Sequence, residues 1–329
     1  MKLKELGEFG LIQKIQRTAP KGKDVRLGIG DDAACVKWRK GSFLVTSDLL
    51  TEGSHFDLRW TSFYGLGYKT LAVNLSDIAA MGGKPSYFLL SLGIPAHLKS
   101  ENVQEFFRGL RALSSKSGTL LVGGDTSAAD RLFVSICLIG YAPYGPIPRS
   151  GAKVGDDLYV TGTLGDSSLG LQFLKTRRHQ ANKAGISHLV SRHRFPVARV
   201  RAGIILARER FAKAMIDVSD GLMQDLGHIC RASRVGAVVW EQTLPLSRPY
   251  RYLVGSKGAT YALTGGEDYE LLFCARVRAR PQLERIRSRL GVKVTRIGTC
   301  VPASQGIKVI DSTGKTVALT AGGYDHFKH

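Results

Sequence analysis

The stretch GIGDDAA at residues 28–34 places two adjacent carboxylates, Asp31 and Asp32, on a glycine-rich turn. Glycine allows a sharp turn that passes close to a ligand, and neighbouring anions repel each other unless a cation lies between them. The spacing also matches the dinucleotide fingerprint G-x-G-x-x-A, in which backbone N–H groups meet a pyrophosphate. Asp31 and Asp32 would repel that anion. The turn is therefore predicted to bind Mg²⁺, or phosphate through Mg²⁺; a plain surface turn is the alternative.

Length and composition indicate a globular protein of two domains. The chain has 329 residues, which is long for a single hydrophobic core, and 43% of its residues are hydrophobic. A stretch with three prolines at residues 143–150 is the expected linker. We therefore expect an N-terminal domain over residues 1–145 and a C-terminal domain over residues 146–329.

The sequence carries no signal for a membrane or for an oxidising compartment. No apolar run approaches the ~18 residues that a membrane span needs, and the charged first residues lack the apolar core of a signal peptide. The five cysteines are scattered and never spaced as C-x-x-C, which argues against a disulfide framework and a structural zinc site. We expect reduced, buried thiols, a cytoplasmic location and no membrane partner.

The chain has 47 basic and 27 acidic residues, a formal net charge of +20. The basic residues concentrate at 175–179, 191–194 and 276–289, without the interleaved aromatic residues of a base-stacking surface. Solvated faces and attraction of anionic substrates explain this charge most simply. No dedicated nucleic-acid partner is expected.

In the first half, carboxylates follow apolar segments at the edges of expected elements. Asp48 ends an expected strand at 43–47, and Asp77 lies on an expected helix at 67–81. A strand at 119–122, expected to be buried, leads through two glycines to Asp125. His55, in the loop after Asp48, is by itself an ordinary surface histidine. The first 20 residues are expected to form an amphipathic helix.

The second half repeats this arrangement. A strand at 214–217 leads into Asp217 and Asp220. Ser219 or Asp220 could cap the following helix, but capping needs only one of them and leaves Asp217 unexplained. A strand at 261–264 is expected before Gly265, Gly266 and further acids, and a helix is expected at 281–290. Arg149, at the expected domain boundary, could bind a phosphate in a bidentate manner, or could be an exposed linker charge. The Walker-like GKT at 314–316 lacks the earlier glycine and is predicted to be a hairpin turn.

The recurring acids indicate a site for hard cations. Carboxylates without a cysteine or histidine cluster favour Mg²⁺ over zinc or copper. Several such ions beside an arginine suit phosphoryl transfer, although metal-assisted hydrolysis would use the same groups. The acids that share this pattern are Asp31, Asp32, Asp48, Asp77, Asp125, Asp217 and Asp220.

Over nearly its whole length, the chain resembles the thiamine-monophosphate kinase family. That family belongs to a superfamily with aminoimidazole ribonucleotide synthetase, selenophosphate synthetase and a hydrogenase maturation factor. The matching motifs are GIGDDA (28–33), TSD (46–48), GSHF (53–56), NLSDIAAMGG (74–83), GGDT (123–126), RSGAKVGD (149–156), TGTLGD (161–166), DVSDG (217–221), GGEDYEL (265–271) and GYDHF (323–327). The last two together distinguish the kinases from their superfamily. Ser54 departs from the residue usual in these kinases.

The resemblance implies ATP-dependent phosphorylation of thiamine monophosphate to thiamine diphosphate, with several Mg²⁺ ions. It implies two α/β domains, with the N-terminal sheets of two subunits pairing in a homodimer. The implied metal positions are Asp31, Thr46, Ser47, Asp48, Asp77, Asp125, Asp217 and Asp220. The implied ATP contacts are Gly124, Asp125, Arg149 and Ser219, and the implied substrate contacts are His55, Glu267 and Tyr324. Asp217, Asp220 and Arg149 would be catalytic.

Two alternatives remain at this point. One is another ATP-dependent enzyme of the superfamily, such as a purine-pathway or selenophosphate-type synthetase; Glu267 and Tyr324 favour the kinase over it. The other is a basic nucleic-acid-binding protein on an inactive scaffold, against which the acids argue because they repel nucleic acid.

Overall fold

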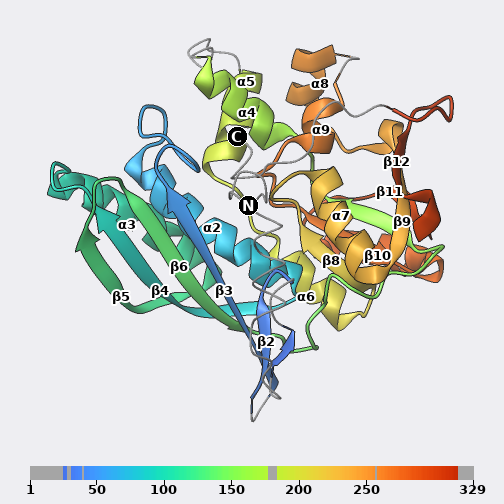
Figure 1. The fold of residues 1–329 in the computed structure, drawn as a ribbon, viewed down its shortest axis with the longest axis horizontal. Helices are drawn as coiled ribbons and strands as arrows, with labels where there is room; N and C mark the ends of the chain where they lie inside the picture. Colours follow the sequence, from blue (N-terminus) through green and yellow to red (C-terminus); the bar gives the residue numbers. More distant parts are fainter. Residues whose placement is uncertain (1–24, 28–30, 39–40, 177–183, 256–257, 318–329) are drawn as a thin grey trace, which may run out of the picture.

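The computed structural model describes residues 25–27, 31–38, 41–176, 184–255 and 258–317. Two α/β domains lie side by side, each built on one six-stranded sheet (Figure 1). The expected helix over the first 20 residues and the GYDHF segment lie outside the described residues. None of the helices within those ranges is long and apolar enough to cross a bilayer.

The N-terminal sheet has the strand order β1-β2-β3-β6-β4-β5. All neighbouring strands are antiparallel except β4 and β5, which are parallel. Helices α2 and α3 pack on one face of this sheet. The strands are β1 (Val25–Leu27), β2 (Ala34–Trp38), β3 (Gly41–Thr51), β4 (Lys84–Ile94), β5 (Leu120–Ala128) and β6 (Phe133–Tyr141), and the helices are α2 (Phe63–Ala80) and α3 (Ser100–Ser117).

Alternation along β4 explains how the sheet is covered. Phe88, Leu90 and Leu92 are buried against α2 and α3, whereas Tyr87 and Leu89 are exposed on the opposite face. The expectation of a buried strand at 119–122 was wrong, because all nine residues of β5 are exposed in the single chain. As the edge strand of the sheet, β5 has one neighbouring strand, β4, among the described residues, and none of the described helices buries its apolar residues.

The C-terminal sheet has the order β12-β9-β11-β7-β10-β8, with β12 and β9 parallel and the other pairs antiparallel. The strands are β7 (Asp157–Thr161), β8 (Ala212–Asp217), β9 (Val235–Trp240), β10 (Leu271–Ala275), β11 (Val294–Pro302) and β12 (Ile307–Ile310). The helices are α4 (Asp166–Lys175), α5 (Ala184–Arg194), α6 (Val200–Arg208), α7 (Leu222–Ser233), α8 (Arg248–Val254), α9 (Thr260–Thr264), α10 (Arg280–Arg285) and α11 (Arg287–Leu290).

Two local expectations for this domain need correction. Residues 261–264 belong to the short helix α9 rather than to a strand, because Ala262 and Leu263 turn into the core beside α7. The expected helix at 281–290 is divided into α10 and α11 at Ile286. Residues 311–316 form a turn closed by a bridge between Ile310 and Thr316, as the hairpin prediction required.

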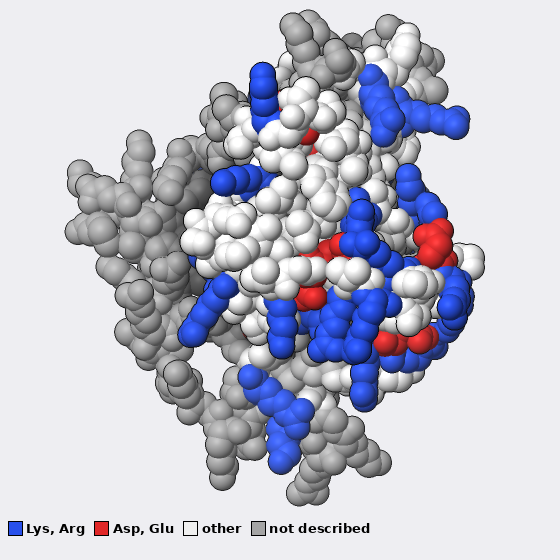
Figure 2. Space-filling view, turned by 90° about the vertical axis from the view of Figure 1, so that its right-hand side faces the viewer, with Lys and Arg blue, Asp and Glu red and all other residues white. Residues whose placement is uncertain are grey.

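Basic side chains gather on the C-terminal domain. The face in Figure 2 shows lysines and arginines concentrated at lower right, with few acidic side chains among them. Two of the arginines, Arg280 and Arg296, pair with the buried carboxylate of Asp157 at 2.7 and 3.4 Å. The exposed arginines of the segment between β10 and β11 are Arg276, Arg278, Arg280, Arg285, Arg287 and Arg289.

Helix α2 joins the two domains. Its N-terminal part packs in the first core, whereas Ala79 and Ala80 share a second core with Leu206 of α6 and Met215 of β8. The two helices touch at Gly203 of α6, where an added Cβ would lie 2.1 Å from the carbonyl oxygen of Ala79. Only glycine permits this approach, which fixes α2 against the second domain.

Replacing Gly203 by alanine is predicted to destabilise the protein by about 1–3 kcal/mol, because the new methyl group would force α2 and α6 apart. Urea unfolding measures the change. Gly227→Ala in α7 is the matched control: its Cβ would meet only the flexible end of Arg231, so stability should hold or rise by up to about 1 kcal/mol. Equal stabilities of the two variants would contradict the proposed helix contact.

Candidate active site

A cavity of about 670 Å³ lies where the two domains meet. Its walls come from the 31–32 turn, β3 and α2 of the first domain, and from the segments after β8 and before β10 of the second. The predicted site residues that line it are Asp31, Thr46, Ser47, Asp48, His55, Asp77, Arg149, Asp217, Ser219, Asp220 and Glu267. The fold therefore collects residues from seven of the sequence motifs.

Two predicted site residues lie away from this cavity, and a third is not described. Gly124 and Asp125 lie on the exposed edge strand β5, opposite Leu90 and Ser91 of β4, and do not line this cavity in the single chain. Tyr324 lies outside the described residues.

Asp32, Asp77 and Asp217 form the centre of the acidic wall. One carboxylate oxygen from each lies within 4.8 Å of the others, although the three come from a turn, a helix and a strand. Burial, and then repulsion by the other carboxylates, raises the pKa of Asp77 and of Asp217 well above the ordinary value. Ionising all three is therefore unfavourable without a cation.

Hydroxyl groups orient two of these acids. Thr46 donates a hydrogen bond to Oδ2 of Asp77 at 2.5 Å, and Ser76 donates to Oδ2 of Asp217 at 2.6 Å. The second bond crosses the domain boundary, since Ser76 is on α2 and Asp217 ends β8. These bonds fix one oxygen of each carboxylate, Oδ2.

Asp48 adds a fourth carboxylate from β3. Burial, together with the charges of Asp220 and Asp32, raises its pKa to about 6. Its backbone N–H donates to Oδ1 of Asn74 on α2 at 3.2 Å, and the Asn74 amide donates in turn to the carbonyl of Thr70. Asn74 and Asp77, three residues apart on α2, thus serve the site in different ways: Asn74 holds β3, and Asp77 presents a carboxylate.

Arg149 holds the two-aspartate turn. Its backbone N–H donates to Asp31 at 2.7 Å, and its guanidinium donates to both oxygens of Asp32 at 2.7 and 3.3 Å. Burial opposes its charge, but Asp32 outweighs this and raises the pKa of Arg149. The side chain is half-buried beside the cavity rather than an exposed linker charge.

A second cluster lies after the DVSDG motif. Asp220, Asp225 and His228 each offer a ligand atom within 4.8 Å of the others. Asp225, in the first turn of α7, accepts hydrogen bonds from the backbone N–H groups of Asp220 and Gly221 at 3.1 Å. The N-cap of α7 is Gly221 rather than Ser219 or Asp220, the two residues that the sequence suggested. Asp220 lines the cavity.

The GGEDYEL motif is held against the DVSDG motif by its backbone. The N–H groups of Glu267 and Tyr269 donate to the carbonyls of Ser219 and Val218 at 2.7 and 2.8 Å. Glu267 and Tyr269 both have positive φ angles, 67° and 52°, which residues other than glycine rarely adopt. Such strain persists where the surroundings fix it, and it often marks a functional segment.

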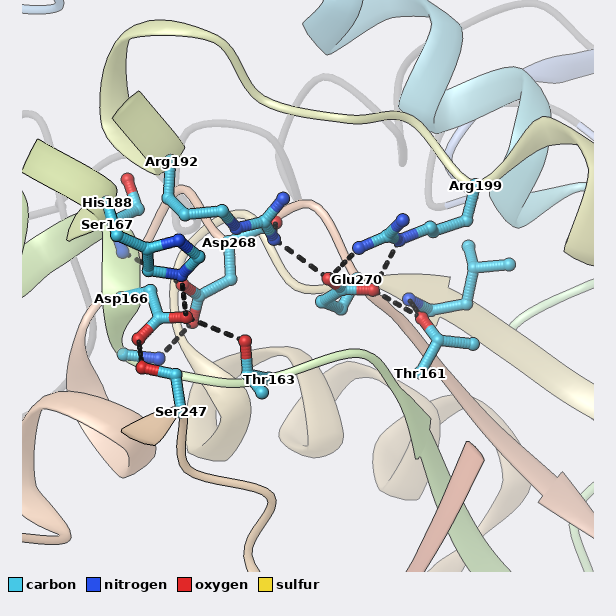
Figure 3. Close-up of polar contacts among 12 residues, drawn as sticks. Thr161, Thr163, Asp166, Ser167, His188, Arg192, Arg199, Ser247, Asp268 and Glu270 are labelled. Carbon is cyan, nitrogen blue, oxygen red and sulfur yellow. Dashed lines mark hydrogen bonds and ion pairs between the residues drawn. The ribbon is translucent and has the colours of Figure 1, made fainter. Parts of the chain in front are cut away.

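The other two acids of this motif anchor it inside the C-terminal domain. Arg192 and Arg199 approach the fully buried Glu270 from opposite sides, at 2.8 and 2.5 Å, and Thr161 donates to it at 2.7 Å (Figure 3). Asp268 accepts from the backbone N–H groups of Gly165 and Ser167 at the start of α4. Burial nevertheless raises the pKa of Asp268 to about 8.

Sequence reasoning assigned no role to several residues of this site. Lys69 forms an ion pair with Glu267, and His193 and Tyr269 line the cavity beside it. Lys69 could have been noticed as a charged residue in the first half of α2, where its neighbours are mostly apolar or small. A buried lysine at such a position needs a partner. Nothing near His193 in the sequence indicates that it meets Glu267, which lies 74 positions away.

The donor set fits Mg²⁺. Oxygen ligands predominate on the acidic wall, and the raised pKa values show that these carboxylates lack enough positive charge around them. The guanidinium of Arg149 compensates for the charge of Asp32 through its two hydrogen bonds to that carboxylate.

Comparisons with known proteins agree with this arrangement. Family models match residues 30–142 (AIR synthase related protein, N-terminal domain) and 153–311 (AIR synthase related protein, C-terminal domain). The thiamine-monophosphate kinase of Escherichia coli O157:H7 is 39% identical over 325 residues, 98% of each chain. These matches and those below confirm the expected two-domain α/β fold.

Two solved structures are also similar. AaThiL complexed with AMPPCP and TMP is 35% identical, covers 99% of each chain and has a TM-score of 0.87. The thiamine-monophosphate kinase from Stenotrophomonas maltophilia K279a is 37% identical, covers 94% of this chain and 98% of its own, and has a TM-score of 0.77.

Binding of Mg²⁺ to these carboxylates would depend on pH. The pKa of Asp48 rises on folding from 3.8 to about 6, so without Mg²⁺ its burial lowers stability increasingly as pH rises through this range. Mg²⁺ binds the ionised form. The increase in melting temperature caused by Mg²⁺ is therefore predicted to be larger at pH 8 than at pH 5, with EDTA as the reference.

Two variants serve as controls for this measurement of melting temperature. Asp77→Asn should reduce the effect of Mg²⁺ at pH 8, whereas Glu105→Gln, on the exposed side of α3, should leave it unchanged. An equal Mg²⁺ effect at both pH values in the wild-type protein would contradict the proposed carboxylate site.

Proposed function

Because this chain belongs to the thiamine-monophosphate kinase family, a family of phosphotransferases, we propose that it transfers the terminal phosphoryl group of ATP directly to thiamine monophosphate. The products are thiamine diphosphate and ADP. One observation carries this proposal: a single cavity unites a half-buried arginine and an acidic cluster with the carboxylate of Glu267. The full-length similarity to kinases favours this reaction over that of the related synthetases.

Mg²⁺ would be held by the acidic wall, where it would neutralise phosphate charge during transfer. Arg149 would bind a phosphate group of ATP, and the exposed backbone near Ser219 would position it. Besides Asp125, which is discussed below, the residues that would hold Mg²⁺ are Asp31, Thr46, Ser47, Asp48, Asp77, Asp217 and Asp220.

Direct, in-line transfer is supported by the nature of the acceptor. The phosphate of thiamine monophosphate is already anionic at neutral pH, so no strong general base is needed to activate it. No cysteine is among the residues that line the described part of the cavity. One ring nitrogen of His193 is engaged by Glu267 and one of His55 by the backbone N–H of Thr51.

We further propose that Glu267 and His55 contact the thiamine part of the substrate, together with Tyr324. His55 lies in the loop after β3, and its Nδ1 accepts a hydrogen bond from the N–H of Thr51 at 3.1 Å. The hydrogen of a neutral ring is therefore on Nε2, which makes this nitrogen a donor.

We expect the enzyme to act in the cytoplasm.

A homodimer would cover the exposed edge of the N-terminal sheet. Leu120 and Val122 of β5 are 59% and 58% exposed, and Tyr87 and Leu89 add to the apolar surface. Unpaired, apolar edge strands are unusual in monomers, because they invite pairing with another chain. Gly124 and Asp125 lie on the same strand, so pairing here would place their ATP and metal contacts at the subunit interface.

Asp217→Asn is predicted to abolish most kinase activity, because it removes one charge of the acidic cluster while preserving the hydrogen bond from Ser76. We expect kcat to fall by at least about a hundredfold, since even outer partners of metal ligands contribute 10–100-fold. The assay follows thiamine diphosphate formed from ATP, Mg²⁺ and thiamine monophosphate. Glu105→Gln is the control, and near-normal turnover by Asp217→Asn would refute the assignment.

Val122→Glu is predicted to convert the dimer to monomers, because it places a charge in the centre of the covered surface. Light scattering after gel filtration gives the molar mass. Val154→Glu changes a valine that is 57% exposed on a turn of the other domain and should leave the dimer intact. A monomeric wild-type protein at micromolar concentration would contradict the dimer.

A further inference from the structure

Helix α2 carries a lysine where the fold otherwise places apolar and small residues. Lys69 is 2% exposed, lies in the same helix as Asp77 and is not among the residues that line the cavity. Its Nζ lies 2.5 Å from Oε1 of Glu267, the only carboxylate with which it pairs within the described residues. Burying an ammonium group is costly, so its retention at this position indicates a task for the pair.

Glu267 is held at both oxygens. Oε2 lies 3.1 Å from Nδ1 of His193, and Nδ1 also lies 3.1 Å from the hydroxyl of Ser167. A carboxylate only accepts hydrogen bonds, so His193 carries a hydrogen on Nδ1. Lys69 and His193 keep the pKa of Glu267 low despite burial, while burial and Lys69 lower that of His193.

These contacts come from separate parts of the molecule. Lys69 is on α2 of the first domain, and His193 is on α5 of the second. Glu267 itself lies on a left-handed backbone that bonds to Ser219. The side chain of Glu267 is 26% exposed and lines the cavity, whereas that of Lys69 is 3% exposed and does not line it. The geometry fixes the direction of one acceptor that a bound molecule can reach.

We propose that Lys69 and His193 are positioning residues that hold the carboxylate of Glu267 so that it accepts a hydrogen bond from the amino group of the aminopyrimidine ring of thiamine monophosphate. This inference rests on the proposed function. A carboxylate has about four lone-pair sites, of which Lys69 and His193 use two. The remaining sites suit the N–H donors of an amino group and would leave an oxo group in that position without a donor.

A purely structural role would have a different signature. If the pair only joined the domains, its loss would lower stability and affect all substrates alike. If it positions Glu267, its loss weakens recognition of the amino group specifically, because a misdirected acceptor contributes little. The substrate analogue oxythiamine monophosphate, with an oxo group in place of the amino group, separates these cases.

The test compares kcat/KM for thiamine monophosphate and for the oxythiamine analogue, in the dimeric full-length enzyme with ATP and Mg²⁺. Wild type should prefer the natural substrate at least about tenfold, the effect expected of one hydrogen bond to a charged group. In Lys69→Met this preference should fall to about threefold or less, through a higher KM for thiamine monophosphate at unchanged KM for ATP. Lys116→Met, an exposed lysine of α3, should behave as wild type.

A double-mutant cycle completes the test. Glu267→Gln should also lose the preference, and Lys69→Met combined with Glu267→Gln should be no worse than the poorer single variant, because Lys69 acts through Glu267. The double variant also keeps the test valid if Lys69→Met alone fails to fold, since it leaves no buried charge unpaired. Folding is checked by the melting temperature.

The outcomes separate the two proposals. A wild-type enzyme that phosphorylates neither compound overturns the proposed function and this inference together. A wild-type enzyme that turns over thiamine monophosphate without preferring it, or a Lys69→Met enzyme that keeps the full preference, overturns the inference alone. Additive losses in the double variant would do the same, because they would show that Lys69 acts independently of Glu267.

Discussion

Repulsion between buried carboxylates is the constraint on which the rest of the structure depends. Asp32, Asp77 and Asp217 converge within 4.8 Å, and Asp48 lies close enough for their charges to affect its pKa. No folded chain gains stability from such an arrangement by itself. We propose that it is retained because a bound divalent cation and phosphate groups can use the same oxygens. In this proposal the site is incomplete until its ligands bind, and ligand binding also joins the two domains.

Helix α2 makes this arrangement possible. It presents Asp77 to the first domain's side of the cavity, holds β3 through Asn74, and directs Ser76 to Asp217 in the second domain. About two turns before Asp77 along the helix, Lys69 reaches Glu267. Its C-terminal end is fixed by the contact of Ala79 with Gly203. A single helix therefore sets the positions of the acids proposed to bind metal and of the carboxylate proposed to face the substrate.

The sequence allowed much of this to be predicted, because glycines and small residues surround the acids of the site. Asp48, Asp77 and Asp217 could be found in this way, and the family resemblance added His55 and Glu267. The exposure of β5 could not be predicted, since the sequence of an apolar edge strand is the same as that of a core strand until its neighbours are known. His193 could not be found because its partner, Glu267, is distant in sequence and nothing beside the histidine points to it. Lys69 stands out by its position, but its partner could not be named from the sequence.

The central claim is that the acids of both domains form one divalent-cation site, and counting bound Mn²⁺ by electron paramagnetic resonance tests it most directly. Wild-type protein with AMPPCP and thiamine monophosphate should bind more than one Mn²⁺ per chain, and at least one of these should be lost in each of Asp77→Asn, from the first domain, and Asp217→Asn, from the second. Unchanged Mn²⁺ counts in both variants would contradict the account.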